Sequence, residues 1–512
     1  MDAVVSTTNG KLRGLAFDGG WQFRGVPYAV PPLGALRFKA PARLVSWQGT
    51  RDAQHYPPAA IQDVGPTNPV GAISEDCLYL NVWTPALDRK KRPVLVWIHG
   101  GSFVSGSASM PQYQCHHLVK RGDVVAVTIN YRLGILGFAH LKDQYGERVD
   151  SNLGLRDQIA ALAWVRDNIA EFGGDPDNIT LFGESAGAIC IATLLTSPLI
   201  KGWIKNAIIQ SGSPDYVLAP AEAERLRCLY WPELELATDH ALWSQPAECF
   251  LKAQRFVLKQ KAQRGLHQHA MPLYGMTLIP VVGDDVLPRS PLEFYKNTPI
   301  NTRVLLGTMS QEWNFFLKVP QGAKGAFVDR YKDLDLEGLQ ALFERSLPGA
   351  GEEALQAYYH ESDLFKENDP QFSAKLLDLY GDFESDKAFG EPSLCIAEHQ
   401  SALGGQVFHY LCSWDRGAFG AAHAADIPLV FGEVDSGFGR MFTGGGDEAR
   451  ALSEKMQDAW LAFARTGNPS TPALGEWPAF SPQTPNTMEL GSRCQLFKQN
   501  HGAVRRFWAQ RL

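Results

Sequence analysis

Three stretches of the chain are apolar at nearly every position. They cover residues 93–98, 124–130 and 179–182, and small or polar residues follow each of them. Strands that are apolar on both faces suit the centre of a sheet that helices cover on both sides. Similar short runs predict further strands at 78–83, 206–209, 304–306 and 407–411.

Between the second and third of these strands, apolar residues recur with helical spacing. Within residues 155–172, Ile159, Leu162 and Val165 are three positions apart, and two glycines follow the stretch. This spacing predicts an amphipathic helix, and the glycines favour its end. A second helix is predicted from about residue 186 to residue 196. The alternation of strands and helices predicts an α/β fold, with helices flanking a central, mostly parallel sheet.

Other segments depart from this alternation. Asn9-Gly10 between apolar residues predicts a β-hairpin at the N-terminus. Residues 216–270 and 326–390 are polar and show weak helical periodicity, and we interpret them as helical insertions that form a lid or cap over the sheet. Because no Gly/Ser-rich or Pro-rich linker divides the chain, we expect residues 1–512 to form a single elaborated domain.

Charge and hydropathy narrow the classes of function. Lys and Arg total 48 against 55 Asp and Glu, which gives a formal net charge of −7. A nucleic-acid-binding protein needs a basic face, so this balance argues against one. The apolar runs of the chain, such as 94–98 and 124–127, fall far short of the roughly 20 residues that span a bilayer. The N-terminus also lacks the pattern of a signal peptide, so we expect a cytoplasmic protein without a membrane span.

The eight cysteines are widely spaced. The closest two, Cys395 and Cys412, are 17 positions apart, which excludes a local CxxC redox or zinc motif. In a large chain without an export signal, buried free thiols are expected rather than disulfides. We expect no metal and no cofactor.

The most informative motif is Gly-Glu-Ser-Ala-Gly at residues 183–187. It lies where a predicted strand turns into a predicted helix, and G-x-S-x-G in that context is typical of a nucleophile elbow. Such a turn exposes the Ser185 hydroxyl, and the helix behind it presents backbone N–H groups, including that of Ala186, to a developing oxyanion. The alternative is a glycine-rich turn with an idle serine.

A second motif, His-Gly-Gly-Ser-Phe at 99–103, directly follows the strand at 93–98. Consecutive glycines let backbone N–H groups point at one spot. Hydrolases with a nucleophile elbow use such a loop to complete the oxyanion hole. Gly101 and Ser102 are therefore further candidate oxyanion donors.

These motifs resemble those of the type-B carboxylesterases, a family of α/β-hydrolases that includes carboxylesterases, cholinesterases and bacterial para-nitrobenzyl esterases. The most specific block is Glu-Asp-Cys-Leu-Tyr-Leu-Asn-Val at 75–82. Further matching segments follow in family order at 23–28, 36–38, 130–132, 172–176, 181–187, 210–213 and 466–469. The resemblance covers most of the chain. It implies an α/β-hydrolase fold and a serine carboxylesterase that acts on small-molecule esters.

The resemblance also locates partners for Ser185. The family's acid is a Glu shortly after a strand that ends in Gly-Thr, which fits Glu312, although Gln311 and Trp313 stand where Asp and Gly are usual. The alternative for Glu312 is a solvated loop residue, and Trp313 is expected near the pocket. The family's histidine fits His423, which precedes Ala-Ala-Asp-Ile-Pro-Leu-Val-Phe-Gly. The chain order of nucleophile, acid and histidine is that of the fold.

In the implied mechanism, His423 takes the proton of Ser185 as the serine attacks an ester carbonyl, and Glu312 orients the imidazole. Water then releases the acyl group from the enzyme. The resemblance places Glu184 and Ser211 at positions that support the histidine. It also implies two structural ion pairs, Arg37 with Glu75 and Arg132 with Asp157.

Two other functions stay open. Residues 216–270 match the family poorly, so a specialised esterase for aryl esters, carbamates or a toxin ester is an alternative to a broad one. The second alternative is a non-catalytic, adhesion-type protein. The complete set of Ser185, Glu312 and His423 argues against that alternative. The segment 63–74 has no aromatic residue to receive a quaternary ammonium, so choline esters are not expected substrates. No cysteine precedes Cys77, so the disulfide that secreted relatives form there is not expected.

Overall fold

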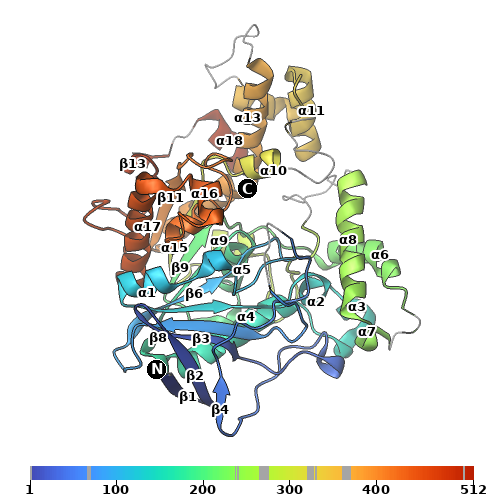
Figure 1. Ribbon diagram of the computed structural model, residues 1–512. Coiled ribbons are helices and arrows are strands. Elements are labelled where there is room, and N and C mark those ends of the chain that lie inside the picture. The colour runs from blue at the N-terminus through green and yellow to red at the C-terminus, as the bar shows by residue number, and fades with distance from the viewer. Residues whose placement is uncertain are drawn as a thin grey trace.

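The computed structural model describes residues 3–65, 71–236, 238, 241–264, 276–319, 328, 331–359, 371–499 and 502–512. Within these residues, thirteen strands form one sheet in the order β1-β2-β3-β5-β7-β6-β8-β9-β10-β11-β12-β13, and β4 pairs with β2 (Figure 1). The strands are β1 (Ala3–Thr7), β2 (Gly10–Phe17), β3 (Gly20–Pro27), β4 (Thr50–Asp52), β5 (Tyr79–Thr84), β6 (Arg92–Ile98), β7 (Val125–Ile129), β8 (Gly174–Glu184), β9 (Asn206–Gln210), β10 (Arg303–Met309), β11 (Val407–Cys412), β12 (Asn486–Leu490) and β13 (Gln495–Lys498).

The middle of the sheet is parallel, as predicted. All neighbours from β7 through β12 pair in parallel, whereas β1, β2, β3, β5 and β7 form an antiparallel flank and β13 an antiparallel edge. Asn9-Gly10 lies at the predicted hairpin, where Thr7 pairs with Gly10. One strand is longer than predicted: β8 begins at Gly174, opposite Arg92, and pairs again only from Ile179. The intervening residues are polar and include Pro176, which hides this extension in the apolar pattern.

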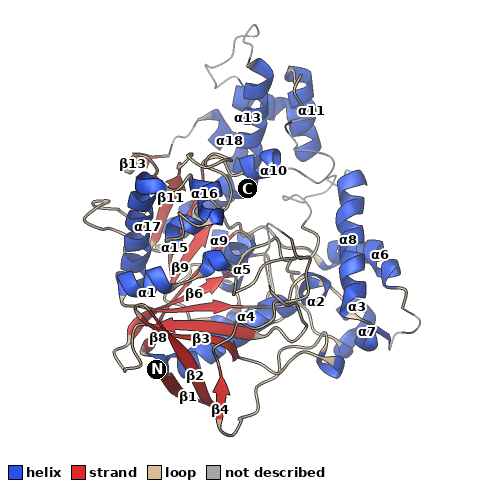
Figure 2. Cartoon of the chain, in the orientation of Figure 1, coloured by secondary structure: helices blue, strands red, loops and turns tan. Residues whose placement is uncertain are grey.

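Helices surround the sheet, and Figure 2 shows them around the central strands. The α-helices are α1 (His116–Gly122), α2 (Gly134–Phe138), α3 (Lys142–Tyr145), α4 (Leu153–Asn168), α5 (Ala186–Leu194), α6 (Pro220–Tyr230), α7 (Ala241–Ser244), α8 (Ala247–Arg264), α9 (Pro291–Asn297), α10 (Asn314–Lys318), α11 (Leu336–Ser346), α12 (Gly351–Tyr359), α13 (Phe372–Ser385), α14 (Glu391–Ala402), α15 (Ile427–Phe431), α16 (Gly437–Thr443), α17 (Gly446–Thr466) and α18 (Ala503–Ala509). A π-helical turn, η9 (Asp386–Gly390), joins α13 to α14. No described helix combines the length and hydropathy that a bilayer crossing needs.

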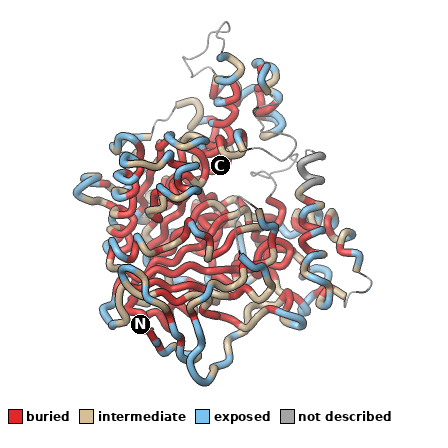
Figure 3. Tube along the Cα trace, in the orientation of Figure 1, coloured by how far each residue is buried: buried red, intermediate tan, exposed pale blue. Residues whose placement is uncertain are grey.

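The sheet separates two apolar cores. Along β6, Val94, Val96 and Ile98 belong to one core, which includes residues of α4 and α5. Leu95 and Trp97 belong to the other, which includes residues of α1, α15 and α17. Successive strand residues face opposite sides, so a strand that is apolar throughout supplies both cores. The buried trace of the sheet in Figure 3 follows from this pattern.

The two predicted insertions are helical where the structure describes them. Helices α6, α7 and α8 lie in the first, and α11, α12 and α13 lie in the second. Residues 237, 239–240 and 265–270 of the first, and residues 326–327, 329–330 and 360–370 of the second, lie outside the described residues. The role of these helices as a lid stays a prediction.

The structure confirms the predicted ion pairs and thiols. Arg132 donates two hydrogen bonds to the buried carboxylate of Asp157, from Nε at 2.8 Å and Nη2 at 2.7 Å. Arg37 pairs with Glu75 in the same two-point manner. All eight cysteines, Cys77 included, are free thiols.

Candidate active site

The predicted site residues come from four parallel strands and lie just beyond their carboxyl ends. Ser185 follows β8, the loop with Gly101 and Ser102 follows β6, and Glu312 follows β10. His423 lies eleven residues beyond the end of β11. The carboxyl ends of parallel strands meet at one edge of a sheet, which is where ligands bind in open α/β folds. Residues far apart in the chain thereby reach one place.

Ser185 stands on a sharply turned backbone between β8 and α5. Its φ of 55° and ψ of −129° form a conformation that residues with a side chain rarely adopt. Its N–H donates to the carbonyl of Gln210 at 3.0 Å, which ties the turn to β9. A Cβ on Gly187 would lie 2.0 Å from the carbonyl oxygen of Ile98, so only glycine lets α5 start this close to β6. This is the geometry expected of a nucleophile elbow.

The glycine loop after β6 lies directly against this turn. Gly101 has a φ of 108° and Ser102 a φ of 55°. A Cβ on the neighbouring Gly100 would lie 3.0 Å from Cβ of Ser185, so the backbone of the loop and the serine are in contact distance. Ala186, the third predicted donor, is the first residue of α5. The three predicted oxyanion donors therefore lie on two segments beside Ser185, namely the glycine loop after β6 and the first turn of α5.

His99 fixes the start of this loop. Its ring stacks on Tyr131 with 4.5 Å between centroids, and its Nδ1 lies 2.8 Å from the carbonyl of Gly100. The Tyr131 hydroxyl donates to the His99 carbonyl at 2.7 Å. Burial lowers the pKa of His99 to about 4, so its imidazole is neutral at physiological pH. These contacts make His99 a support for the loop backbone.

Glu312 is fully buried, and both of its carboxylate oxygens are bound. Oε2 lies 2.6 Å from Nδ1 of His423. Oε1 accepts hydrogen bonds from Oγ of Ser211 at 2.5 Å and from the N–H of Met309 at 2.7 Å. The structure therefore excludes a solvated loop position for Glu312. Ser211 contacts this carboxylate directly and reaches the histidine through it.

His423 lies between two carboxylates. Its backbone N–H donates to the carbonyl of Glu312 at 3.1 Å, which fixes the main chain as well as the ring. With Nδ1 engaged by Glu312, Nε2 lies 3.0 Å from Oε1 of Glu184. That contact is an ion pair of bent geometry, since Oε1 has no hydrogen-bond donor. Glu184 is the residue before Ser185 in the chain, so this contact links His423 to the strand end that carries the elbow.

These charges set the protonation of the site. Burial alone would lower the pKa of His423, but Glu184 and Glu312 outweigh burial and raise it to about 9. Burial raises the pKa of Glu184 to about 8, against the attraction of His423 and with repulsion from Asp426 and Glu312. Both groups therefore hold protons more strongly than they would in water.

Two aromatic rings that the sequence motifs do not mark bracket the histidine. Phe389, in η9, stacks on His423 with 4.8 Å between centroids, and Phe316, in α10, lies at 5.5 Å. Trp313 is buried and packs on Phe316 at 4.6 Å, so it reaches the histidine through that ring. Phe389 belongs to the second helical insertion. The insertion therefore touches the general-base candidate itself.

Asp426 is a further buried carboxylate beside the site. It accepts hydrogen bonds from Gln210 at 2.9 Å and from the Tyr410 hydroxyl at 3.1 Å. Burial raises its pKa to about 6. The sequence motif after His423 contains this residue, but only the structure shows that it is enclosed.

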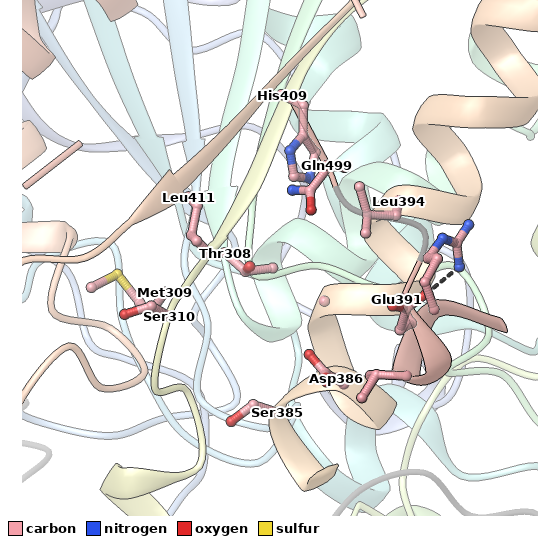
Figure 4. A pocket seen from close by; sticks show the side chains of 14 residues that line it. Thr308, Met309, Ser310, Ser385, Asp386, Glu391, Leu394, His409, Leu411 and Gln499 are labelled. Carbon is pink, nitrogen blue, oxygen red and sulfur yellow. Dashed lines mark hydrogen bonds and ion pairs between the residues drawn. The ribbon is translucent and has the colours of Figure 1, made fainter. Parts of the chain in front are cut away.

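A separate cavity of about 310 Å³ is lined in part by Thr308 and Met309, at the end of β10, the strand before Glu312 (Figure 4). His409 and Gln499 lie at one end and Ser385 and Asp386 at the other, and the ion pair of Glu391 with Arg505 closes one side. The predicted site residues are not among those that line it. Met309 lines the cavity and also donates its N–H to Glu312, so the cavity and the candidate site adjoin at the end of β10.

Comparison with known proteins places this geometry in context. The family model described as "Carboxylesterase family" matches residues 1–508. The chain is 35% identical to the para-nitrobenzyl esterase of Bacillus subtilis (strain 168), over 96% of each sequence. It is 32% identical to the phenmedipham hydrolase of Pseudarthrobacter oxydans, over 98% of this chain and 99% of that one.

Solved structures agree in the fold. A carboxylesterase of Geobacillus stearothermophilus superposes with a TM-score of 0.85 at 35% identity, with 99% of each chain covered. A structure described as a PNB esterase superposes with a TM-score of 0.79 at 32% identity, with 99% of this chain covered. The predicted α/β-hydrolase fold is thereby confirmed.

Proposed function

Because the chain belongs to the carboxylesterase family and is a carboxylic-ester hydrolase, we propose that it works through a Ser185–Glu312–His423 triad and an acyl-enzyme. The observation that carries this proposal is the buried contact of 2.6 Å between Glu312 and Nδ1 of His423, next to the strained turn of Ser185. A serine hydroxyl is a weak nucleophile at neutral pH and needs an adjacent base. An imidazole oriented by a buried carboxylate is such a base.

In the first half-reaction, Nε2 of His423 accepts the proton of Ser185 while Oγ bonds to the ester carbonyl carbon. The carbonyl oxygen becomes an oxyanion, which the N–H groups of Gly101, Ser102 and Ala186 stabilise. One such donor is worth about 3–4 kcal/mol in the transition state. The imidazolium then donates its proton to the leaving alkoxide, and the carbon–oxygen bond to the alcohol breaks.

In the second half-reaction, water replaces the alcohol. His423 takes a proton from water as its oxygen attacks the acyl-enzyme carbonyl, and Ser185 leaves with that proton restored. Glu312 stays ionised through both steps and stabilises the imidazolium that forms twice. Because His423 must be neutral to act as the base, its raised pKa predicts that activity increases as the pH rises towards about 9.

The relatives suggest where to look for substrates. We propose small esters, beginning with para-nitrobenzyl esters, since a relative of this name matches along nearly the whole chain. Phenmedipham is the second compound to try, because the relative named for its hydrolysis is 32% identical. A panel that varies the acyl and alcohol parts separately would show which side of the pocket is large.

The decisive experiment compares wild type with Ser185→Ala on a para-nitrobenzyl ester. We expect kcat to fall roughly 10⁴- to 10⁶-fold, and an organophosphate to label the wild type at Ser185 with a stoichiometry of one. Ser401→Ala, a serine on α14, is the control and should retain full activity. Full activity of Ser185→Ala would disprove the mechanism.

A further inference from the structure

A compact cluster of metal-type ligands that does not include the predicted triad residues lies partly exposed to solvent. His116 and His117 open α1, and Glu433 lies two residues beyond the end of α15. Nε2 of His116 is 3.6 Å from Oε1 of Glu433, and Nε2 of His117 is 3.9 Å from the same oxygen. One ligand atom from each residue lies within 4.8 Å of the others.

These separations suit a small divalent ion. Ligands about 2.0–2.1 Å from a tetrahedral zinc ion lie roughly 3.3–3.5 Å from one another. The two distances from the histidines to Glu433 therefore need to shorten by only a few tenths of an ångström. Two histidines and one glutamate are a donor set that zinc accepts. The side chains are 39%, 47% and 19% exposed, so an ion can enter and keep water as a fourth ligand.

The backbone at Gly432 lets the segment with Glu433 lie close to the start of α1. A Cβ on Gly432 would lie 3.0 Å from Cβ of His117, so glycine beside Glu433 lets the two segments come together. Gly432 also has a φ of 76°, which reverses the chain after α15 and directs Glu433 back toward α1. The cluster is therefore held by two helix ends.

Three cations lie beside the cluster, and each pairs with a carboxylate other than Glu433. Lys120 is the cation that faces both rings, and it is paired with Asp18. Two more cations, Arg121 and Arg450, line the adjoining hollow; Arg121 pairs with Asp458, and Arg450 pairs with Asp435 and Asp447. Among the described residues, Glu433 pairs with none of these three cations.

We propose that His116, His117 and Glu433 bind a divalent transition-metal ion, with Zn²⁺ as the preferred occupant. A bound ion would clip the start of α1 to the segment that carries His423, which lies ten residues before Glu433. The site would be structural and would stabilise the fold around α15, because the triad does not include its ligands.

Isothermal titration of the full-length enzyme with Zn²⁺ tests the proposal. We expect one ion per chain on wild type, and Glu433→Gln to weaken binding more than about tenfold, since Gln keeps the shape and removes the charge. The double variant His116→Asn/His117→Asn should abolish binding. Zinc should raise the Tm of wild type and leave that of the double variant unchanged.

His55→Asn is the matched control, because His55 is 86% exposed and its nearest carboxylate, Asp52, is 3.9 Å away. It should bind zinc as wild type does. Co²⁺ serves as a spectroscopic probe: strong visible absorption on wild type, absent in the double variant, supports four-coordinate binding. Equal zinc affinity in wild type and Glu433→Gln, as expected if the ion occupies His423 and its carboxylates instead, would overturn the proposal. Failure of wild type to bind zinc at millimolar concentration would overturn it as well.

Discussion

The strand ends and the second helical insertion differ in how their segments pack. At the strand ends, buried strands and close-packed glycines leave little freedom, and a Cβ on Gly187 or Gly101 would collide with a carbonyl. In the insertion, α11, α12 and α13 pack chiefly on one another and on α18. Figure 1 shows α11, α13 and α18 together near the C-terminus. The strand ends hold the chemical groups, whereas the insertion supplies apolar surface around them.

The two regions meet at His423. Glu312 holds one edge of its ring from the strand ends, and Phe389 covers its face from the insertion. If this division is correct, changes at the strand ends should affect the rate by orders of magnitude, and changes in the insertion by small factors.

The largest effect is expected for Glu312→Gln. The amide keeps the size of the side chain but loses the charge that stabilises the imidazolium and selects its tautomer, so kcat should fall about 10⁴-fold. Steady-state kinetics on a para-nitrobenzyl ester measure this change. Glu293→Gln, an exposed residue in the first turn of α9, is the control. A loss smaller than about tenfold would show that Glu312 is not the triad acid.

A smaller, pH-dependent effect is expected for Glu184→Gln. Removing this carboxylate removes a major force that raises the pKa of His423, so that pKa should fall. A lower pKa makes the base neutral at lower pH, and the rising limb of kcat/KM against pH should move down by about one unit. Asp426→Asn, which removes a more weakly acting carboxylate, should move it less. An unshifted limb in Glu184→Gln would contradict the electrostatic role.

The smallest effect is expected for Phe389→Leu in the insertion. Loss of the stacked ring frees the imidazole, and aromatic contacts of this kind are worth about 0.5–1.5 kcal/mol, so kcat should fall roughly 2- to 10-fold while KM changes little. Phe343→Leu is the matched control: it lies in α11, 4.5 Å from Phe383, and should lower Tm without lowering kcat. Equal kinetics for the two variants would remove Phe389 from the site.

The sequence predicts the parts that local patterns encode. The apolar runs mark the parallel strands, and the elbow and glycine loop are contiguous motifs. Glu312 and His423 follow from the family resemblance rather than from physical pattern. The structure adds what depends on distant contacts: the link from Ser211 to Glu312, and Phe389, which lies 34 positions before His423 within a segment that has no motif. His117 and Glu433 are 316 positions apart, so no spacing rule could pair them.

The twisted backbone at Ser185 has an evolutionary consequence. Conformations of this kind cost of order 1–3 kcal/mol for a residue with a side chain, more than the roughly 0.5–1 kcal/mol that glycine loses through its greater freedom when unfolded. Folding stability by itself would therefore favour glycine at position 185. If Ser185 is the nucleophile, as proposed above, selection for turnover is what keeps a serine at this position despite the cost in stability. Without that selection, a single Ser185→Gly substitution would be expected to raise the stability of the protein and abolish its activity.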